Sequence, residues 1–322
     1  MPIEVVVVGS YVQDHCWNTR TFPRVGESRI GTFSTGPGGK GFNQAVACQR
    51  QGVRTAFLGA IGKDLLGDTA RRFADDESLT AFWDVHPDVA TAASSIVVDG
   101  RGDNLICVAL GANERLSAAF GRQQEKLIRQ AKVLVCQLEN NLEATREALL
   151  IAREHKVLSI LNTAPINEAL TLDLLHLADV ITPNETEFTF LVRHLLKREV
   201  PPGFFDMADG LMHLLCRELG VQTVVMTLGE HGCFVSHDTV QRRGDGDLCY
   251  RLPAESVTVR DTTGAGDAFS GGLAAGLVQQ AFAKPFKGAV RHANRVAALS
   301  TENPGTAPAM PSFDAVRERF GA

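Results

Sequence analysis

Short apolar runs rich in valine, isoleucine and leucine recur along the chain, and stretches with helical spacing lie between several of them. The runs of strand length are residues 3–8, 55–61, 133–138, 157–161, 180–182 and 223–228, and the helical stretches include residues 42–51, 65–73 and 142–154. Continuous apolar strands are buried on both faces, and their alternation with helices indicates a parallel sheet. The predicted fold class is therefore α/β, with a central, mostly parallel sheet flanked by helices.

Two segments interrupt this rhythm. Residues 11–33 follow the first strand but contain Pro23, Gly26 and Gly31 and have no helical period. Residues 94–98 and 105–110 flank a turn-rich stretch and predict a β-hairpin. Because ligands of open α/β sheets bind at the carboxyl ends of the strands, where such excursions emerge, we expect the two segments to form a small separate sheet that acts as a lid.

The last third of the chain is predicted to be mainly helical, over residues 265–279, 284–300 and 312–320. Residues 197–207 contain Pro201, Pro202 and Gly203, which predicts a surface loop between two helices. A length of 322 residues allows two ordinary domains or one large α/β domain.

Charge and composition exclude several classes of protein. Lys plus Arg number 32 against 37 Asp plus Glu, so the net charge of −5 argues against a nucleic-acid partner or an anionic membrane surface. The apolar run at residues 5–8 is far shorter than the roughly 20 residues of a membrane span, and no basic leader precedes it, so we expect no signal peptide. Seven scattered cysteines without a CxxC pair predict reduced, mostly buried thiols and a cytoplasmic location.

The strongest chemical signal is the segment 261–267, Asp-Thr-Thr-Gly-Ala-Gly-Asp, directly before a predicted helix. The backbone N–H groups of Gly264, Ala265 and Gly266 are expected to converge on an anion, which the positive end of the helix dipole also attracts. Asp267 would repel a resting phosphate but could take a proton from a hydroxyl group that attacks it. Alternatively, Asp267 only stabilises the helix dipole.

A second glycine-rich segment, residues 36–44, also precedes a helical stretch. Its glycines permit close approach of a ligand to the backbone, and Lys40 and Asn43 offer donors for a hydroxyl-rich or phosphorylated ligand. It does not match the phosphate loop GxxxxGK[ST], because Gly41 stands where Ser or Thr is required. The first strand lacks the GxGxxG fingerprint, which disfavours a nicotinamide dehydrogenase. A simple helix cap is the structural alternative.

Taken together, these motifs and their order resemble the ribokinase branch of the ribokinase-like (PfkB) carbohydrate kinases. The matching pieces are Gly9-Ser10 with Asp14, Pro23 with Gly26-Glu27, residues 38–47, residues 61–64 with Gly67, residues 111–113, 137–139 and 182–187, 227–229 and 261–267. The resemblance covers nearly the whole chain. It implies one three-layer α/β/α kinase domain over residues 1–322, with a β lid formed by about 11–35 and 94–111.

The resemblance also assigns roles at the reacting centre. Asp267 would be the general base, and the N–H groups of Gly264, Ala265 and Gly266 would form the anion hole for the transferred phosphoryl group. The positions that match the sugar-binding set offer donors and acceptors suited to an uncharged polyol. They are Asp14, Gly39, Lys40, Asn43, Glu139 and Asp267.

For the nucleotide, the resemblance implies ATP with Mg²⁺. The matching nucleotide positions are Asn184, Thr227, Gly229, Gly266 and Asn294. Glu187, in the same Asn-x-x-Glu motif as Asn184, would hold Mg²⁺ through water; the motif is also good helix-start chemistry. A potassium-like ion would bind near Asp261 and Thr263, with backbone carbonyls from residues 300–306, a segment one residue longer than the family pattern that carries Pro304.

The resemblance thus implies a kinase that transfers the γ-phosphoryl of ATP to a primary hydroxyl of a small sugar, ribose above all, and a homodimer paired through the lid. One departure is Val12, where the branch usually has a sugar-binding asparagine two residues before the aspartate that matches Asp14. The alternative is therefore a kinase for another polyol or a nucleoside. A non-catalytic sugar-binding relative is a further alternative, although it would be expected to have lost Asp267, Gly264 or Gly266.

Overall fold

The computed structural model describes residues 2–280 and 285–321, and within them nine strands form one central sheet. In spatial order the strands are β13 (Cys249–Leu252), β12 (Cys233–His237), β11 (Thr223–Thr227), β10 (Val180–Ile181), β9 (Leu158–Leu161), β8 (Val133–Cys136), β1 (Val5–Val8), β4 (Thr55–Gly62) and β5 (Thr80–His86). Every neighbouring pair from β11 to β5 is parallel, and only the pairs β11–β12 and β12–β13, at one edge, are antiparallel, because β12 alone runs in the reverse direction. The predicted fold class is confirmed.

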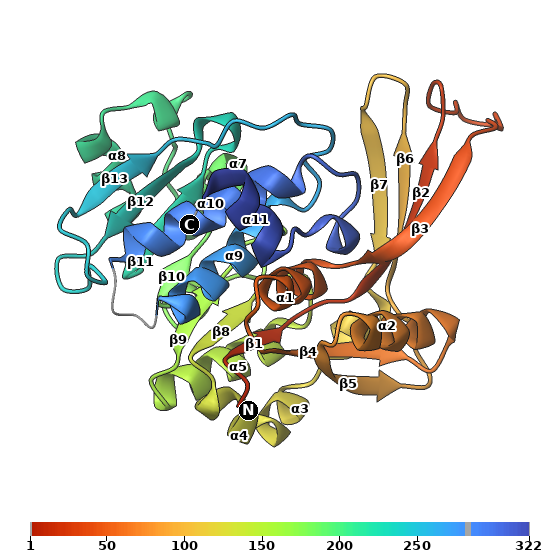
Figure 1. Ribbon diagram of the computed structural model, residues 1–322, viewed down its shortest axis with the longest axis horizontal. Coiled ribbons are helices and arrows are strands. Elements are labelled where there is room, and N and C mark those ends of the chain that lie inside the picture. The colour runs from red at the N-terminus through yellow and green to blue at the C-terminus, as the bar shows by residue number, and fades with distance from the viewer. Residues whose placement is uncertain (1, 281–284, 322) are drawn as a thin grey trace.

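Helices cover both faces of this sheet, which makes three layers (Figure 1). Alternate residues of one strand enter two different cores: Val5 and Val7 of β1 pack into one, Val6 and Val8 into the other. The first face is covered by α1 (Lys40–Arg50), α2 (Leu65–Asp76), α9 (Ala265–Gln279), α10 (Phe286–Ser300) and α11 (Phe313–Phe320). The second is covered by α3 (Ala118–Gln123), α4 (Glu125–Gln130), α5 (Leu142–Glu154), α6 (Leu172–Leu175), α7 (Glu185–Leu196) and α8 (Asp209–Arg217).

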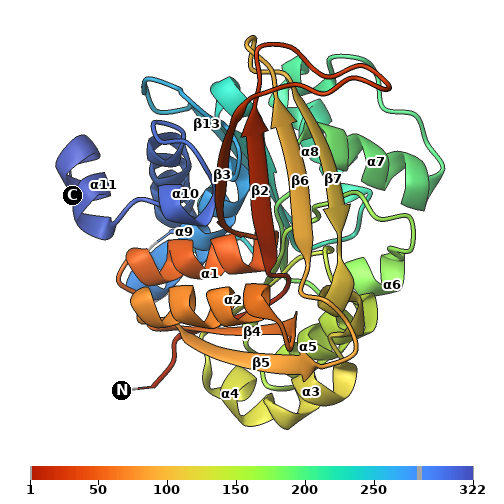
Figure 2. The same cartoon turned by 90° about the vertical axis from the view of Figure 1, so that its right-hand side faces the viewer.

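A second, four-stranded sheet stands apart from the central one (Figures 1 and 2). Its strands, in spatial order, are β3 (Thr32–Gly38), β2 (Val12–Asn18), β6 (Ala93–Val98) and β7 (Asn104–Ala109). β6 and β7 form the predicted hairpin, whereas β2 pairs in parallel with β6 about eighty residues further along the chain. Both interrupting segments therefore contribute strands to one small sheet.

The predicted elements differ from the structure mostly at their ends. α1 begins at Lys40 rather than residue 42, because Gly39 adopts a positive φ of 90° and lets the chain leave β3 directly into the helix. α9 has the predicted bounds, and α11 begins at Phe313 after the N-cap Ser312. Residue 284, where the next helix was predicted to begin, lies outside the described residues, and α10 begins at Phe286. In the described ranges, no helix is both long and apolar enough to cross a membrane.

Candidate active site

Asp267 lies in the first turn of α9, and two side-chain amides from α1 hold its carboxylate. Asn43 Nδ2 donates to Oδ2 and Gln44 Nε2 donates to Oδ1, each at 2.9 Å. Asp267 is only 6% exposed. Gln44 in turn accepts from Gln137 Nε2, at the end of β8, at 2.7 Å. Each carboxylate oxygen accepts one amide bond from α1, so the orientation of the acid is fixed.

Burial and neighbouring charged groups have opposite effects on the pKa of Asp267, and also on that of Lys40. Burial raises the pKa of Asp267 above its usual range, although the Lys40 ammonium and the two amides act in the other direction. Burial alone would lower the pKa of Lys40, but the nearby carboxylates of Asp267 and Glu139 outweigh it, so the pKa of Lys40 is raised. Lys40 is therefore a permanent cation beside a carboxyl group that holds its proton more readily than an exposed one.

The backbone before α9 turns through Gly264, whose φ of +78° only glycine adopts without strain. The N–H of Ala265 donates to the carbonyl of Thr262 at 3.2 Å. Within the described chain, the N–H groups of Gly264 and Gly266 have no acceptor, as expected at the start of a helix. Two of the three predicted anion donors are thus free here, and the third is engaged in a turn.

A cavity of about 150 Å³ opens beside Asp267 at the carboxyl ends of the parallel strands. Its lining combines residues of both glycine-rich motifs with residues at or after the carboxyl ends of β9, β10 and β11: Lys40, Asn162, Ala164, Thr182, Asn184, Glu187, Thr227, Gly264, Gly266 and Asp267. Sequence reasoning did not assign a role to Asn162, whose Nδ2 donates to the Thr182 carbonyl at 3.0 Å. A polar residue directly after a buried strand was the signal that could have found it.

Asn184 and Glu187 form a capping box at the start of α7. Asn184 Oδ1 accepts from the Glu187 N–H at 2.8 Å, and Glu187 Oε2 accepts from the Asn184 N–H at 3.0 Å. Burial raises the pKa of Glu187, which the Lys40 ammonium partly offsets. The motif therefore starts the helix and at the same time presents a partly buried carboxylate to the cavity.

Two further predicted carboxylates lie where the small sheet and α1 meet. Asp14, on β2, accepts from Ser94 Oγ at 2.6 Å and from Thr306 Oγ1 at 3.3 Å, and burial raises its pKa. Glu139 Oε2 accepts from Ser10 Oγ at 2.6 Å and from the Lys40 N–H at 2.9 Å. The hydroxyl partners Ser94 and Thr306 were not predicted, because nothing in the local sequence relates them to Asp14.

Asp261 and the 300–306 turn are joined as the sequence pattern suggested. The Asp261 carboxylate accepts from the N–H of Thr263 and from the N–H of Gly305, both at 2.9 Å, and the Asp261 N–H donates to the Thr301 carbonyl at 3.1 Å. The longer turn with Pro304 therefore still packs against the segment that precedes α9.

Nine predicted residues do not line the cavity: Asp14, Gly39, Asn43, Glu139, Gly229, Asp261, Thr263, Ala265 and Asn294. Three of them have not yet been placed. Asn294, in α10, is buried, and its Nδ2 donates to the Pro253 carbonyl at 3.1 Å. Gly229 begins a short 3-10 helix after β11, and Gly39 is the N-cap of α1. Gly229 and Asn294 lie near the carboxyl end of β11, because Gly229 follows that strand and Asn294 lies beside Cys233, the partner of Thr227. Gly39 connects β3 to α1.

The comparison with known families settles the class of protein. The profile of the pfkB family carbohydrate kinases matches residues 2–312. This chain belongs to that family. Ribokinases of Haemophilus influenzae and Mus musculus are both 34% identical to it, over 96% and 95% of this chain and 95% and 91% of their own.

The fold of this carbohydrate kinase also matches a solved relative. The structure of Arabidopsis thaliana ribokinase complexed with ribose and ATP superimposes with a TM-score of 0.83 at 26% identity, covering 99% of this chain and 98% of that one. The three-layer fold and the enzyme class thus agree with the sequence resemblance.

Proposed function

We propose that this carbohydrate kinase transfers the γ-phosphoryl of ATP to a primary hydroxyl of ribose. The observation that carries the chemistry is the Asp267 carboxylate, fixed by Asn43 and Gln44 beside the free N–H groups of Gly264 and Gly266. A proton acceptor next to anion donors suits a hydroxyl attacking a phosphoryl group. The names of the two 34% identical relatives support ribose as the sugar.

In the proposed mechanism, Asp267 accepts the proton of the sugar hydroxyl as it attacks. The N–H groups of Gly264 and Gly266, joined by that of Ala265 when it leaves Thr262, donate to the oxygens of the transferred group. The Lys40 ammonium lies near the carboxylates of Asp267 and Glu139 and stabilises the negative charge that develops on the transferred phosphoryl group. Asp14, Asn43 and Glu139 orient the sugar, and Asn43 Oδ1 is a buried acceptor with no partner in the described chain. Thr227, Gly229 and Asn294 are proposed to border the nucleotide.

We propose that Mg²⁺ is held through water by Glu187 with Asn184. The donor set fits, because Mg²⁺ prefers oxygen ligands, keeps several waters and needs few protein carboxylates. The bound ion would neutralise part of the triphosphate charge. Seven unpaired cysteines, four of them buried, support a cytoplasmic location.

A monovalent cation is proposed at Asp261, Thr263 and the carbonyls of residues 300–306. A cation there would help to order the neighbouring N–H groups. We expect the turnover rate to rise when potassium replaces a bulky organic cation at constant ionic strength. Equal rates with sodium, potassium, rubidium, caesium and the organic cation would contradict the site.

The choice of ribose can be tested at Val12. Val12 is buried and shares one face of β2 with Asp14, whereas Gln13 lies on the other face and bonds to Tyr11 and Thr35. If the pocket accepts ribose, Val12→Asn adds a hydrogen bond of ~1 kcal/mol and should lower the KM for ribose roughly fivefold. If Val12 instead packs on an apolar part of a nucleoside, the same change leaves an amide unpaired and weakens that substrate.

Steady-state assays of wild type and Val12→Asn on ribose, deoxyribose, fructose, adenosine and inosine separate the two cases. A gain selective for ribose supports a ribose kinase. A KM for ribose that is unchanged or higher counts against ribose as the substrate.

A homodimer through the small sheet is also proposed. In a single chain this sheet exposes five large apolar side chains to water, which pairing of two sheets would bury. They are Trp17, Phe33, Leu105, Ile106 and Val108. We expect sedimentation equilibrium to give twice the mass of one chain, and Leu105→Lys to shift the protein toward the monomer. Leu211→Lys is the matched control, since Leu105 and Leu211 are 57% and 58% exposed. A monomeric wild type would refute the dimer.

A further inference from the structure

A second cavity, of about 310 Å³, opens at the amino ends of the parallel strands, whereas the active site lies at their carboxyl ends. It is lined at the amino ends of three parallel strands by Leu158 of β9, Asp179 before β10 and Gln222 before β11. At the carboxyl ends of the same three strands lie Asn162, directly after β9, Thr182, directly after β10, and Thr227, the last residue of β11, and all three line the active-site cavity. The length of the sheet therefore separates the two cavities, and the second one has no part in the proposed reaction.

The lining of this second cavity is cationic. It contains Arg153, Lys156 and Arg243 against a single carboxylate, Asp179. Asp179 Oδ2 already accepts from the N–H and the Oγ of Ser159, at 2.8 and 3.0 Å. Lys156 is exposed, and among the described residues its ammonium group has no carboxylate within ion-pair distance. The carboxylates of Asp179 and Asp238 attract the Arg243 guanidinium, which leaves the charges of Arg153 and Lys156 in excess on the lining. In a chain whose net charge is −5, an excess of positive charge in a concave site favours an anionic ligand.

The Arg243 guanidinium is held in position by hydrogen bonds around the cavity wall. Nε donates to Thr223 Oγ1 at 3.0 Å, and Nη2 donates to Gln222 Oε1 at 3.1 Å and to the Asp179 carbonyl at 3.2 Å. Its Nη1 has no acceptor in the described residues. A donor that is fixed in place yet still free suits an oxygen of a bound anion.

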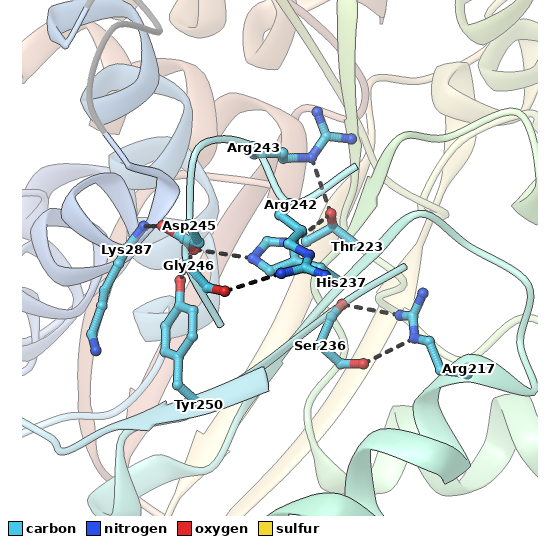
Figure 3. Close-up of polar contacts among 10 residues, drawn as sticks. All are labelled: Arg217, Thr223, Ser236, His237, Arg242, Arg243, Asp245, Gly246, Tyr250 and Lys287. Atoms are coloured by element: carbon cyan, nitrogen blue, oxygen red, sulfur yellow. Dashed lines mark hydrogen bonds and ion pairs between the residues drawn. The ribbon is translucent and has the colours of Figure 1, made fainter. Parts of the chain in front are cut away.

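A network of buried hydrogen bonds begins at Thr223, the acceptor of Arg243 Nε, and holds that acceptor in place (Figure 3). Thr223 Oγ1 contacts His237 Nδ1 at 3.1 Å, and His237 Nε2 contacts Asp245 Oδ2 at 3.0 Å. Asp245 Oδ2 also accepts from Tyr250 OH at 2.6 Å. Thr223 and His237 are completely buried. This network ties the segment that carries Arg243 to β11, β12 and β13, so the guanidinium is preorganised.

Two of the lining residues have an unusual backbone conformation, which Lys197 shares outside the cavity. Of the described non-glycine residues, Ser78, Lys156, Lys197 and Arg243 have a positive φ, and two of these four line this cavity. Left-handed backbone is unfavourable for a residue with a side chain, by roughly 1–2 kcal/mol. At both positions a residue with a long cationic side chain occupies this conformation, although glycine would be the easier choice for the backbone.

We infer that this cavity binds a small molecule that carries a phosphate dianion, either inorganic phosphate or a phosphate monoester. The free Nη1 of Arg243, with the Arg153 guanidinium and the Lys156 ammonium on the same lining, offers charged donors to the oxygens of a phosphate. The volume lies at the lower end of the usual range for small-ligand sites, which excludes a macromolecular partner inside it.

The test is calorimetric titration of the full-length protein with inorganic phosphate and, separately, with ribose 5-phosphate. An excess of a non-hydrolysable ATP analogue keeps the active-site cavity occupied. The variants are Lys156→Gly, which removes the charge and relieves the left-handed backbone, and Arg153→Gln on the exposed face of α5. The matched control is Lys197→Gly, which makes the same change at the other left-handed lysine, at the end of α7.

We expect saturable binding of at least one probe to the wild type, weakened about tenfold by each of Lys156→Gly and Arg153→Gln and unchanged by Lys197→Gly. Binding of inorganic phosphate alone, or of the ester alone, identifies which source the site accepts. Absence of saturable binding at millimolar concentrations, or binding that Lys156→Gly and Arg153→Gln leave unchanged, overturns the site. Because no turnover is measured, this result is independent of the proposed kinase reaction.

Discussion

Asp267→Asn is expected to lower the turnover rate by ~10²–10⁴-fold and to leave the affinity for the nucleotide nearly unchanged. The amide has almost the same shape as the carboxylate but cannot accept the hydroxyl proton. Its NH₂ group can be accommodated, because the Asn43 amide can rotate to present Oδ1, which has no partner in the described chain. Steady-state rates and nucleotide binding of both forms measure the effect.

The pH profile gives a second readout of the same change. Burial raises the pKa of Asp267, so the wild-type rate should fall as the pH is lowered through that pKa, since the protonated acid cannot act as a base. The residual activity of the variant should lack this acid limb. Asp68→Asn, in the first turn of α2, controls for the loss of an acidic residue near a helix start. A variant that keeps more than a third of wild-type turnover would remove Asp267 from the role of base.

Gly38→Ala is expected to raise the KM for the sugar by roughly 10- to 100-fold, whereas Gly36→Ala in the same strand should leave it unchanged. A Cβ at Gly38 would lie 2.1 Å from Asp14 Oδ2, so the carboxylate must leave its place between Ser94 and Thr306. A Cβ at Gly36 would meet nothing closer than Pro308, at 3.9 Å. The expected size is that of one lost hydrogen bond to a charged group.

Kinetics on ribose and thermal unfolding of both variants decide the matter. The two alanine variants should unfold at similar temperatures and bind ATP equally, because only the sugar contact is affected. Equal KM values for the sugar in Gly38→Ala and Gly36→Ala would mean that Asp14 does not bind it.

The small sheet and one side of the central sheet contain strands or strand pairings that the local sequence pattern did not predict. The apolar runs predicted six parallel strands, but β5, β12 and β13 were not predicted. β5 and β13 are partly buried edge strands without a continuous apolar run. β12 is fully buried, but its apolar run is only three residues long and ends at Ser236 and His237. The hairpin of β6 and β7 was predicted from its turn, a local feature. The parallel pairing of β2 with β6 depends on segments about eighty residues apart, which no turn signal relates.

The candidate site divides in the same way. The sequence alone placed Asp267 at the start of a helix, after glycines that free the backbone N–H groups, because short-range residue order controls a helix start. Only the tertiary structure decided that Gln44, 223 residues away, shares that carboxylate with Asn43, and that Ser94 and Thr306 hold Asp14. Those contacts follow from the order of the strands in the sheet, which places the carboxyl ends of strands distant in sequence side by side. Hydrophobic periodicity predicts which face of an element is buried, but it does not predict which other element covers that face.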